Sequence, residues 1–286
     1  MTVFEGFFQG LIQGFTEFLP VSSSGHLSIF QHFFGINGEG ALLSSLVFHL
    51  GTLLAVFIAF WGRISRLIVE FFCLVKDVFT GKFKWCSMNP DRRMIIMIII
   101  SILPLFGFYI FKDFFASLSE DSSIVAEGIG FLYTSAILFL SDRWAKGNKT
   151  SGQTTVKDAL TIGVFQCIAL VPGISRSGST ICAGLFCGLK REAAVEYSFI
   201  LGIPVILAGA LSEIKDASAQ DLNIGMLPLA VGFLTAAVSG FLAIKLIKWL
   251  IKTDKFKIFA FYTLALGILV LAAGIYETVS GNRIGF

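Results

Sequence analysis

Apolar stretches about as long as a membrane-spanning helix recur along this chain of 286 residues and restrict what it can fold into. Clear examples are Leu42–Trp61, Met226–Ile244 and Ile258–Tyr276. A helix needs about 20 predominantly apolar residues to cross a bilayer. The composition agrees, because only 14% of the residues are charged, whereas soluble domains carry about a quarter. We therefore predict an all-α polytopic membrane protein with a single membrane domain over residues 1–286.

The charge and the cysteines argue against two other classes of protein. A formal net charge of +3 at pH 7 is too small to indicate a nucleic-acid partner, so the lipid bilayer is the expected partner. The five cysteines are odd in number and include no CxxC pair. We expect free thiols that pack as small apolar side chains, rather than disulfides or a metal site.

Six segments are expected to cross the membrane once each. Met94–Phe111 contains Pro104, which is expected to kink or break its helix. Residues 63–93 mix aromatic and charged side chains, a pattern typical of a helix lying in the membrane interface. The six expected spans are 42–61, 94–111, 124–141, 195–211, 226–244 and 258–276.

Basic residues in the connections predict the topology. Eighteen lysines and arginines lie in connections 63–93, 142–158, 190–191 and 245–257, and three lie in the other connections and the tail. Connections rich in lysine and arginine stay on the cytoplasmic side. The apolar runs 1–41 and 159–189 would then each begin and end on one side. We predict two re-entrant hairpins that enter from opposite faces, with both termini outside.

An internal repeat supports this topology. Residues 10–29 match residues 163–182 at an offset of 153, and Phe48-x-Leu50-Gly51 resembles Phe199-x-Leu201-Gly202. We predict an inverted-topology repeat, with one copy in 1–141 and the other in 159–276. Such repeats place their sites near the bilayer midplane, so the two hairpin tips are expected to meet. The identical pairs are Gly10/Gly163, Gln13/Gln166, Ser22/Ser175, Ser24/Ser177 and Gly25/Gly178.

The second hairpin carries a polar cluster around its only basic residue, Arg176. A guanidinium offers a fork of donors that matches phosphate oxygens. Hydroxyls, glycines and a restarting helix would add donors, so the cluster is typical of a phosphate-binding turn. The alternative is an ion pair between Arg176 and Glu17 that only holds the hairpins together. The remaining candidate phosphate-binding residues of this turn are Ser175, Ser177, Gly178, Ser179 and Thr180.

The first hairpin carries Glu17, Ser23 and His26 in an apolar run. Ionisable residues inside a membrane are costly and usually functional. His26 could act as acid, base or nucleophile, and Ser23 could attack if a base lies near. The alternative is a serine–glycine turn with a capping histidine and a buried glutamate. The neighbouring candidate substrate-binding residues are Gln13, Ser22, Ser24 and Gly25.

The stretches Gln13–His26 and Pro172–Thr180 closely resemble the two motifs of the undecaprenyl-diphosphate phosphatase family, bacterial enzymes that also confer bacitracin resistance. The resemblance places Glu17, Ser23, His26 and Arg176 at the family's functional positions. It implies a C55 polyprenyl diphosphate as substrate, and inorganic phosphate plus the monophosphate lipid carrier of cell-wall synthesis as products. It also implies a divalent cation, Mg²⁺ or Ca²⁺, and a location in the bacterial plasma membrane.

These inferences combine into one hypothesis, an integral membrane phosphatase acting on a lipid diphosphate. Arg176 and its turn would hold the diphosphate, and Glu17, helped by Gln13, would bind the cation. Ser23 would attack phosphorus with His26 as its base. A phosphohistidine and a directly activated water stay open as alternatives. So do the face that opens for catalysis and the formation of a homodimer.

The competing class is transport. Paired hairpins in an inverted repeat are also a transporter architecture, and a lipid-phosphate flippase or an anion transporter could use Arg176 in the same way. The pairing of His26 with Glu17 and a serine favours chemistry, because binding alone needs no base. A purely structural membrane protein would leave Arg176 unexplained.

Overall fold

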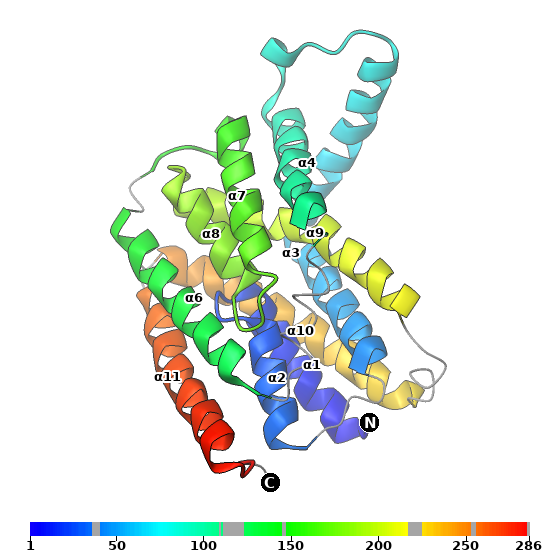
Figure 1. Ribbon diagram of the computed structural model, residues 1–286. Coiled ribbons are helices and arrows are strands. Elements are labelled where there is room, and N and C mark those ends of the chain that lie inside the picture. Colours follow the sequence, from blue (N-terminus) through cyan, green and yellow to red (C-terminus); the bar gives the residue numbers. More distant parts are fainter. Residues whose placement is uncertain are drawn as a thin grey trace.

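The computed structural model describes residues 1–35, 41–108, 110, 123–144, 147–216, 225–252 and 256–284. These residues form ten α-helices, two short 3₁₀ helices (Trp85–Ser87 and Ser151–Gln153) and no β-strand (Figure 1). The described chain is therefore all-helical, as the sequence predicts. In chain order the helices are α1 (Val3–Phe18), α2 (Ser23–Phe33), α3 (Ala41–Phe79), α4 (Pro90–Phe108), α6 (Val125–Trp144), α7 (Val156–Ile168), α8 (Arg176–Phe186), α9 (Arg191–Asp216), α10 (Met226–Lys252) and α11 (Lys257–Ser280).

Five of the described helices, α3, α6, α9, α10 and α11, are long and apolar enough to cross a membrane. They make the chain a polytopic membrane protein. The expected span in α4 is not among them, because this 19-residue helix begins with Asp91, Arg92 and Arg93 and its apolar part is shorter. The helix continues through Pro104 to Phe108, so the expected break is absent within α4.

Helix α3 is longer than the sequence predicts. It runs for 39 residues and bends at Phe60, where φ is −124° and ψ is 18°. Residues 63–79 follow this bend as a helical extension that projects from the body (Figure 1), and their place in the membrane interface stays a prediction. Arg92 of α4 holds this extension, because its guanidinium lies 2.6 Å from Glu70 and 2.8 Å from Asp77.

The first helix of each hairpin packs against the opposite half of the chain. Helix α1 lies along α10, and α7 lies along α4. Gly6, Gly10 and Gly14 recur every four residues on α1, and a Cβ on any of them would overlap the α10 backbone. Small residues at this spacing let membrane helices approach closely, so the glycines explain the tight contact.

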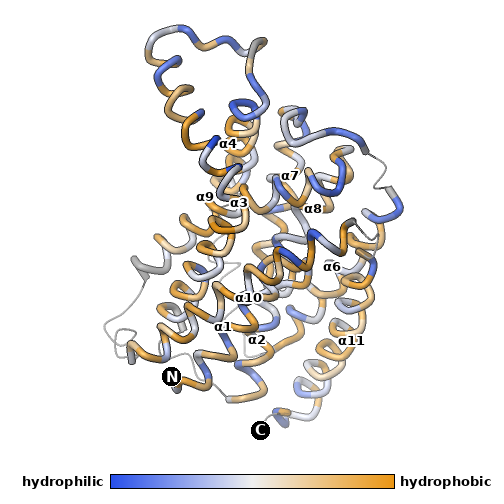
Figure 2. Tube along the Cα trace, turned by 180° about the vertical axis from the view of Figure 1, so that it is seen from behind, coloured by the Kyte–Doolittle hydropathy of each residue, from blue (hydrophilic) through white to orange (hydrophobic). Residues whose placement is uncertain are grey.

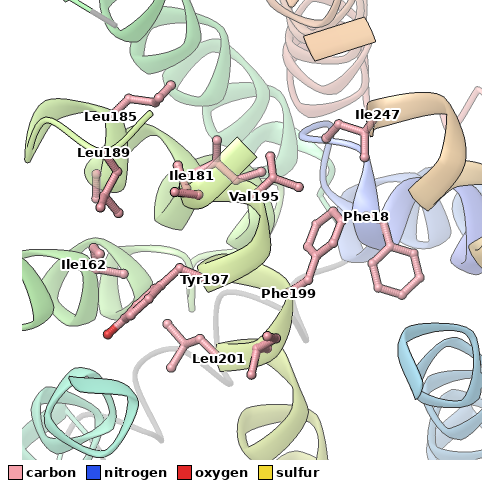
Figure 3. Packing of buried hydrophobic residues seen from close by; sticks show 14 of the residues in the cluster. Phe18, Ile162, Ile181, Leu185, Leu189, Val195, Tyr197, Phe199, Leu201 and Ile247 are labelled. Atoms are coloured by element: carbon pink, nitrogen blue, oxygen red, sulfur yellow. The ribbon is translucent and has the colours of Figure 1, made fainter. Parts of the chain in front are cut away.

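Buried apolar side chains of α1, α7, α8, α9 and α10 pack together in the core (Figure 3). Phe18 of α1 and Phe199 of α9 face each other edge to face, with centroids 5.3 Å apart. Tyr197 and Ser101 share a hydrogen bond of 2.8 Å between their hydroxyls, and Ser101 donates to the Ala159 carbonyl at 2.8 Å. These bonds satisfy buried polar groups and join α4, α7 and α9.

The two termini and two polar loops lie at opposite ends of the molecule. Both termini lie at one end, and loops 80–89 and 147–155 lie at the other (Figure 1). Hydrophilic residues gather in these loops, while the long helices are mostly hydrophobic (Figure 2). The described basic loops are therefore separated from the termini by the length of the helix bundle.

Candidate active site

The tips of the two hairpins meet, as the sequence predicts. Arg176 Nη2 lies 2.5 Å from Glu17 Oε1. The Ser177 hydroxyl donates to the Leu19 carbonyl at 3.1 Å. A Cβ added to Gly25 would lie 3.0 Å from the Gly173 Cα, so the two turns leave no room for a side chain there. Residues about 150 to 160 positions apart in the sequence thus form one junction.

Both tips use the same local structure. Ser22 is the N-cap of α2 and accepts from the Gly25 N–H at 3.3 Å. Ser175 is the N-cap of α8 and accepts from the Gly178 N–H at 3.0 Å. Serine is a favoured N-cap because its hydroxyl satisfies a free amide of the first turn. Both helices therefore begin at the junction, and helix N-termini favour anions such as phosphate.

Glu17 is the centre of the junction. Its buried carboxylate accepts from Arg176, from Gln13 Nε2 at 3.0 Å and from the Ser23 hydroxyl at 2.8 Å. His49 of α3 brings its Nε2 to 3.9 Å from Glu17 Oε2. A buried charge is stable only when it is paired and hydrogen-bonded, and Glu17 has both kinds of partner. The ion pair that the sequence offered as an alternative for Arg176 is present.

The structure does not join Ser23 to His26. The Ser23 hydroxyl donates to Glu17, whereas His26 uses Nδ1 at 2.7 Å from the Ser22 carbonyl oxygen and Nε2 at 2.7 Å from the Tyr262 hydroxyl. The physical reason lies in the turn, which points the His26 ring toward α11. In this arrangement Glu17, rather than the expected His26, is within reach of the Ser23 proton.

The second tip presents one charged group and buries the rest. Arg176 remains partly exposed and also donates to the Ser198 carbonyl at 3.5 Å. The hydroxyl of Thr180 bonds to the Ser198 hydroxyl at 2.6 Å, and Ser175 and Ser177 pair at 3.2 Å. Ser179 is buried with no hydrogen-bond partner among the described residues. Most hydroxyls of the predicted phosphate-binding turn are thus buried, and most of these form hydrogen bonds within the protein.

The first tip leaves more of its predicted residues accessible. Ser24 is exposed and pairs with the Ser22 hydroxyl at 3.3 Å, while Gly25 is buried against Phe131 of α6. Gln13 is buried next to Glu17, as its spacing of four residues predicts. The structure therefore gathers Gln13, Glu17, Ser23 and Arg176 directly.

Sequence reasoning missed three residues near the junction. The first is His49 of α3, whose Nε2 lies 3.9 Å from Glu17 Oε2. Its neighbours Phe48 and Gly51 belong to the short repeated pattern, which was a usable signal. Tyr262 lies 236 residues from His26 in an apolar run, and Thr134 of α6 accepts from the Ser175 N–H at 3.0 Å. Nothing local in the sequence distinguishes these last two.

The residues fit an oxygen-bound cation to a limited extent. The described chain contains no cluster of three or more histidine, cysteine, aspartate or glutamate side chains that could hold a metal. Gln13 Oε1 is buried without a partner in the described structure, directly beside the Glu17 carboxylate. Amide and carboxylate oxygens suit Mg²⁺ or Ca²⁺, so Glu17 and Gln13 could supply part of a coordination shell that a phosphate completes.

A cavity of about 330 Å³ lies away from the junction. Its lining includes Arg63, Lys190 and Glu196 and none of the hairpin-tip residues. Arg63 pairs there with Asp91 and lies 3.0 Å from Glu196, so the positive charge is balanced. We therefore place the candidate site at the hairpin tips and not in this cavity.

Comparison with known proteins identifies the family of this chain. The family model described as bacitracin resistance protein BacA matches residues 6–269, which include both hairpins. The chain belongs to the BacA family. Curated relatives named undecaprenyl-diphosphatase occur in Halothermothrix orenii (39% identity, 96% of this chain and 100% of the relative) and Alkaliphilus metalliredigens (36%, 95% and 98%). Another with that name, from Methanosphaera stadtmanae, is 38% identical over 92% of this chain and 94% of its own length.

Proposed function

We propose that this BacA-family protein is an undecaprenyl-diphosphatase of the bacterial plasma membrane. It hydrolyses undecaprenyl diphosphate to undecaprenyl phosphate and inorganic phosphate, which recycles the lipid carrier of peptidoglycan synthesis. The observation that carries the proposal is the contact series Ser23–Glu17–Arg176. It combines a hydroxyl nucleophile, a proton acceptor and a phosphate-binding cation at one buried junction.

In the proposed mechanism, Arg176 leaves Glu17 in part to bind the diphosphate, and its charge stabilises the transition state. Ser23 transfers its proton to Glu17 and forms a bond to the terminal phosphorus, while the bond to the bridging oxygen breaks and undecaprenyl phosphate leaves. Water then hydrolyses the phosphoserine to release inorganic phosphate. The hydrogen bond from Ser23 to Glu17 at 2.8 Å supports this order of proton transfer.

A divalent cation, Mg²⁺ or Ca²⁺, is part of the proposal. Glu17 and Gln13 would hold it, because they offer adjacent oxygens and the Gln13 carbonyl has no other described partner. When bound, such an ion neutralises phosphate charge. Glu17 and Gln13 orient one another through their hydrogen bond, so loss of Gln13 would weaken binding of the cation rather than the attack by Ser23.

The proposed topology has six spans and two re-entrant hairpins within an inverted repeat of 1–141 and 159–276. Both termini would lie outside, and the basic connections inside. The common end of the two termini and the opposite position of loops 80–89 and 147–155 support this arrangement (Figure 1). Cysteine accessibility at positions 20–26 and 172–180 tests it, since labelling of both tips from one face only would contradict opposite entry.

The decisive assay of function uses the purified protein in detergent with undecaprenyl diphosphate. Release of inorganic phosphate without a membrane or a potential is expected, and Glu17→Gln should remove it. Absence of release, combined with movement of lipid phosphates across proteoliposomes, would favour the flippase or anion-transporter alternative. The presence of a hydroxyl bonded to a buried carboxylate favours chemistry over transport.

A further inference from the structure

Tyr262 of α11 lies outside both hairpins and yet contacts His26. Its hydroxyl is 2.7 Å from His26 Nε2. The two rings are nearly parallel, with 9° between their planes and centroids 5.7 Å apart. Phe131 of α6 meets the His26 ring edge to face at 5.3 Å. Three helices therefore fix the position of one imidazole.

The hydrogen bond of the other ring nitrogen, Nδ1, shows which nitrogen of His26 carries the proton. His26 Nδ1 lies 2.7 Å from the Ser22 carbonyl oxygen. A carbonyl can only accept, so Nδ1 must carry hydrogen, and in the neutral ring Nε2 has the lone pair. The Tyr262 hydroxyl therefore donates to Nε2. The backbone of Ser22, which carries this carbonyl, has a φ of 72°. Such a left-handed conformation is costly for serine and typical of functional turns.

We infer that Tyr262 is a positioning residue for His26, an inference that rests on the proposed phosphatase function. A phenol hydroxyl can donate to the lone pair of a neutral imidazole, or accept from the N–H of a charged one. The contact can thus hold the ring in both charge states. It also keeps Nε2 away from Ser23, whose hydroxyl is bonded to Glu17. The imidazole is thereby held at the first hairpin tip without rotating, and Glu17 is the group that receives the Ser23 proton.

Other groups around His26 do not replace this contact. Ser28 of the same helix is turned to Glu127 of α6, at 2.7 Å, and Phe131 offers no hydrogen bond. Tyr262 is about half exposed, so its ring can be replaced by phenylalanine without opening a buried cavity. The chain also offers a matched control in Tyr276, a half-exposed tyrosine on the same helix α11.

The kinetic test compares Tyr262→Phe with wild type and with Tyr276→Phe. Loss of the hydroxyl should lower kcat about tenfold, in line with one hydrogen bond to a functional group, and change KM less than about twofold. Tyr276→Phe should leave both constants unchanged. In a His26→Asn background, Tyr262→Phe should have almost no further effect, because residues acting through one another are non-additive. An unchanged kcat in Tyr262→Phe, or an equal loss in the His26→Asn background, would overturn the inference.

A second measurement does not depend on activity. The chain has only three histidines, so ¹⁵N-histidine NMR can observe each, with His26 assigned by its loss in His26→Asn. Wild type should show protonated Nδ1 and a hydrogen-bonded Nε2, and Tyr262→Phe should shift only the His26 signals. Unshifted signals would refute the contact. If undecaprenyl diphosphate is not hydrolysed at all, the proposed function fails while this measurement still decides the role of Tyr262.

Discussion

The two hairpin tips share a Ser-x-Ser-Gly turn but differ in burial. In α8 the nine consecutive residues Ser177–Leu185 are buried, whereas Gly25 is the buried residue of α2. The second tip is packed between α6, α7 and α9. The first tip contacts α6 and α11 through single residues, with Gly25 against Phe131 and His26 bonded to Tyr262. The same short pattern thus supports a rigid tip and an accessible one.

The difference assigns a separate task to each tip. At the offset of the repeat, Ser23 in the first hairpin corresponds to Arg176 in the second. The rigid tip presents Arg176, whose planar guanidinium needs a fixed orientation to bind two oxygens at once. In the proposed mechanism, the accessible tip presents the Ser23 hydroxyl to the lipid substrate. The repeat thus places Ser23 and Arg176 at equivalent positions, where one offers a hydroxyl and the other a positive charge.

Removal of the hydroxyl should have the largest effect. Ser23→Ala should lower kcat by about 10⁴-fold, because no other hydroxyl is bonded to Glu17 among the described residues. Glu17→Gln should be similarly damaging, and the double variant little worse than either single variant. Phosphate release measures this, and rapid quench should trap acid-stable phosphoserine. An acid-labile adduct would instead support His26 as nucleophile, and normal turnover of Ser23→Ala without any adduct would support direct attack by water.

Replacement of Arg176 should have the second-largest effect on activity. Arg176→Lys keeps the charge beside Glu17 but loses the planar fork and the contact with the Ser198 carbonyl. We expect a fall of about 10³-fold in kcat/KM with normal insertion and folding. Arg191→Lys is the matched control, since Arg191 pairs with Asp142 at 2.8 Å outside the site. Near-normal turnover of Arg176→Lys would mean that the ion pair with Glu17 is structural only.

The hydrogen bond between the two hairpins should make a smaller contribution, to stability rather than to activity. Ser177→Ala removes the hydroxyl that donates to the Leu19 carbonyl, at a cost of about 1 kcal/mol in the free energy of unfolding. Thermal unfolding in detergent measures the change. Thr161→Ala, which loses a bond within its own helix α7, should cost less. Equal losses would show that the contact does not join the tips.

The backbone difference between the tips should have the smallest effect. Ser22 has a φ of 72° and Ser175 a φ of −72°. Glycine relieves about 1 kcal/mol of left-handed strain at position 22, which offsets the lost cap, whereas at position 175 it gives no relief. We expect Ser175→Gly to be less stable than Ser22→Gly by about 1 kcal/mol. The reverse order in thermal unfolding would contradict a strained first tip.

Sequence reasoning succeeded where a pattern is local or repeated. The repeat and the cluster around Arg176 predicted that distant turns meet, and Glu17 contacts Arg176. It failed for the pairing of Ser23 with His26, because the positive φ of Ser22 has no sequence signature in a serine. It also did not predict the ion pairs of residues 63–79, where the charges indicated a helix in the membrane interface. Glu70 and Asp77 are instead neutralised by Arg92, a contact made only in three dimensions.

The packing of each hairpin on the opposite half has a consequence for biosynthesis. The glycines of α1 fit against α10, and α10 begins only at Met226. The ribosome synthesises the chain from its N-terminus, so the first hairpin is made long before its packing surface exists. During that interval the Glu17 carboxylate also lacks Arg176. The nascent first half therefore needs the translocon or water to solvate this charge. The packing of the first hairpin is completed only when α10, in the last fifth of the chain, has been made.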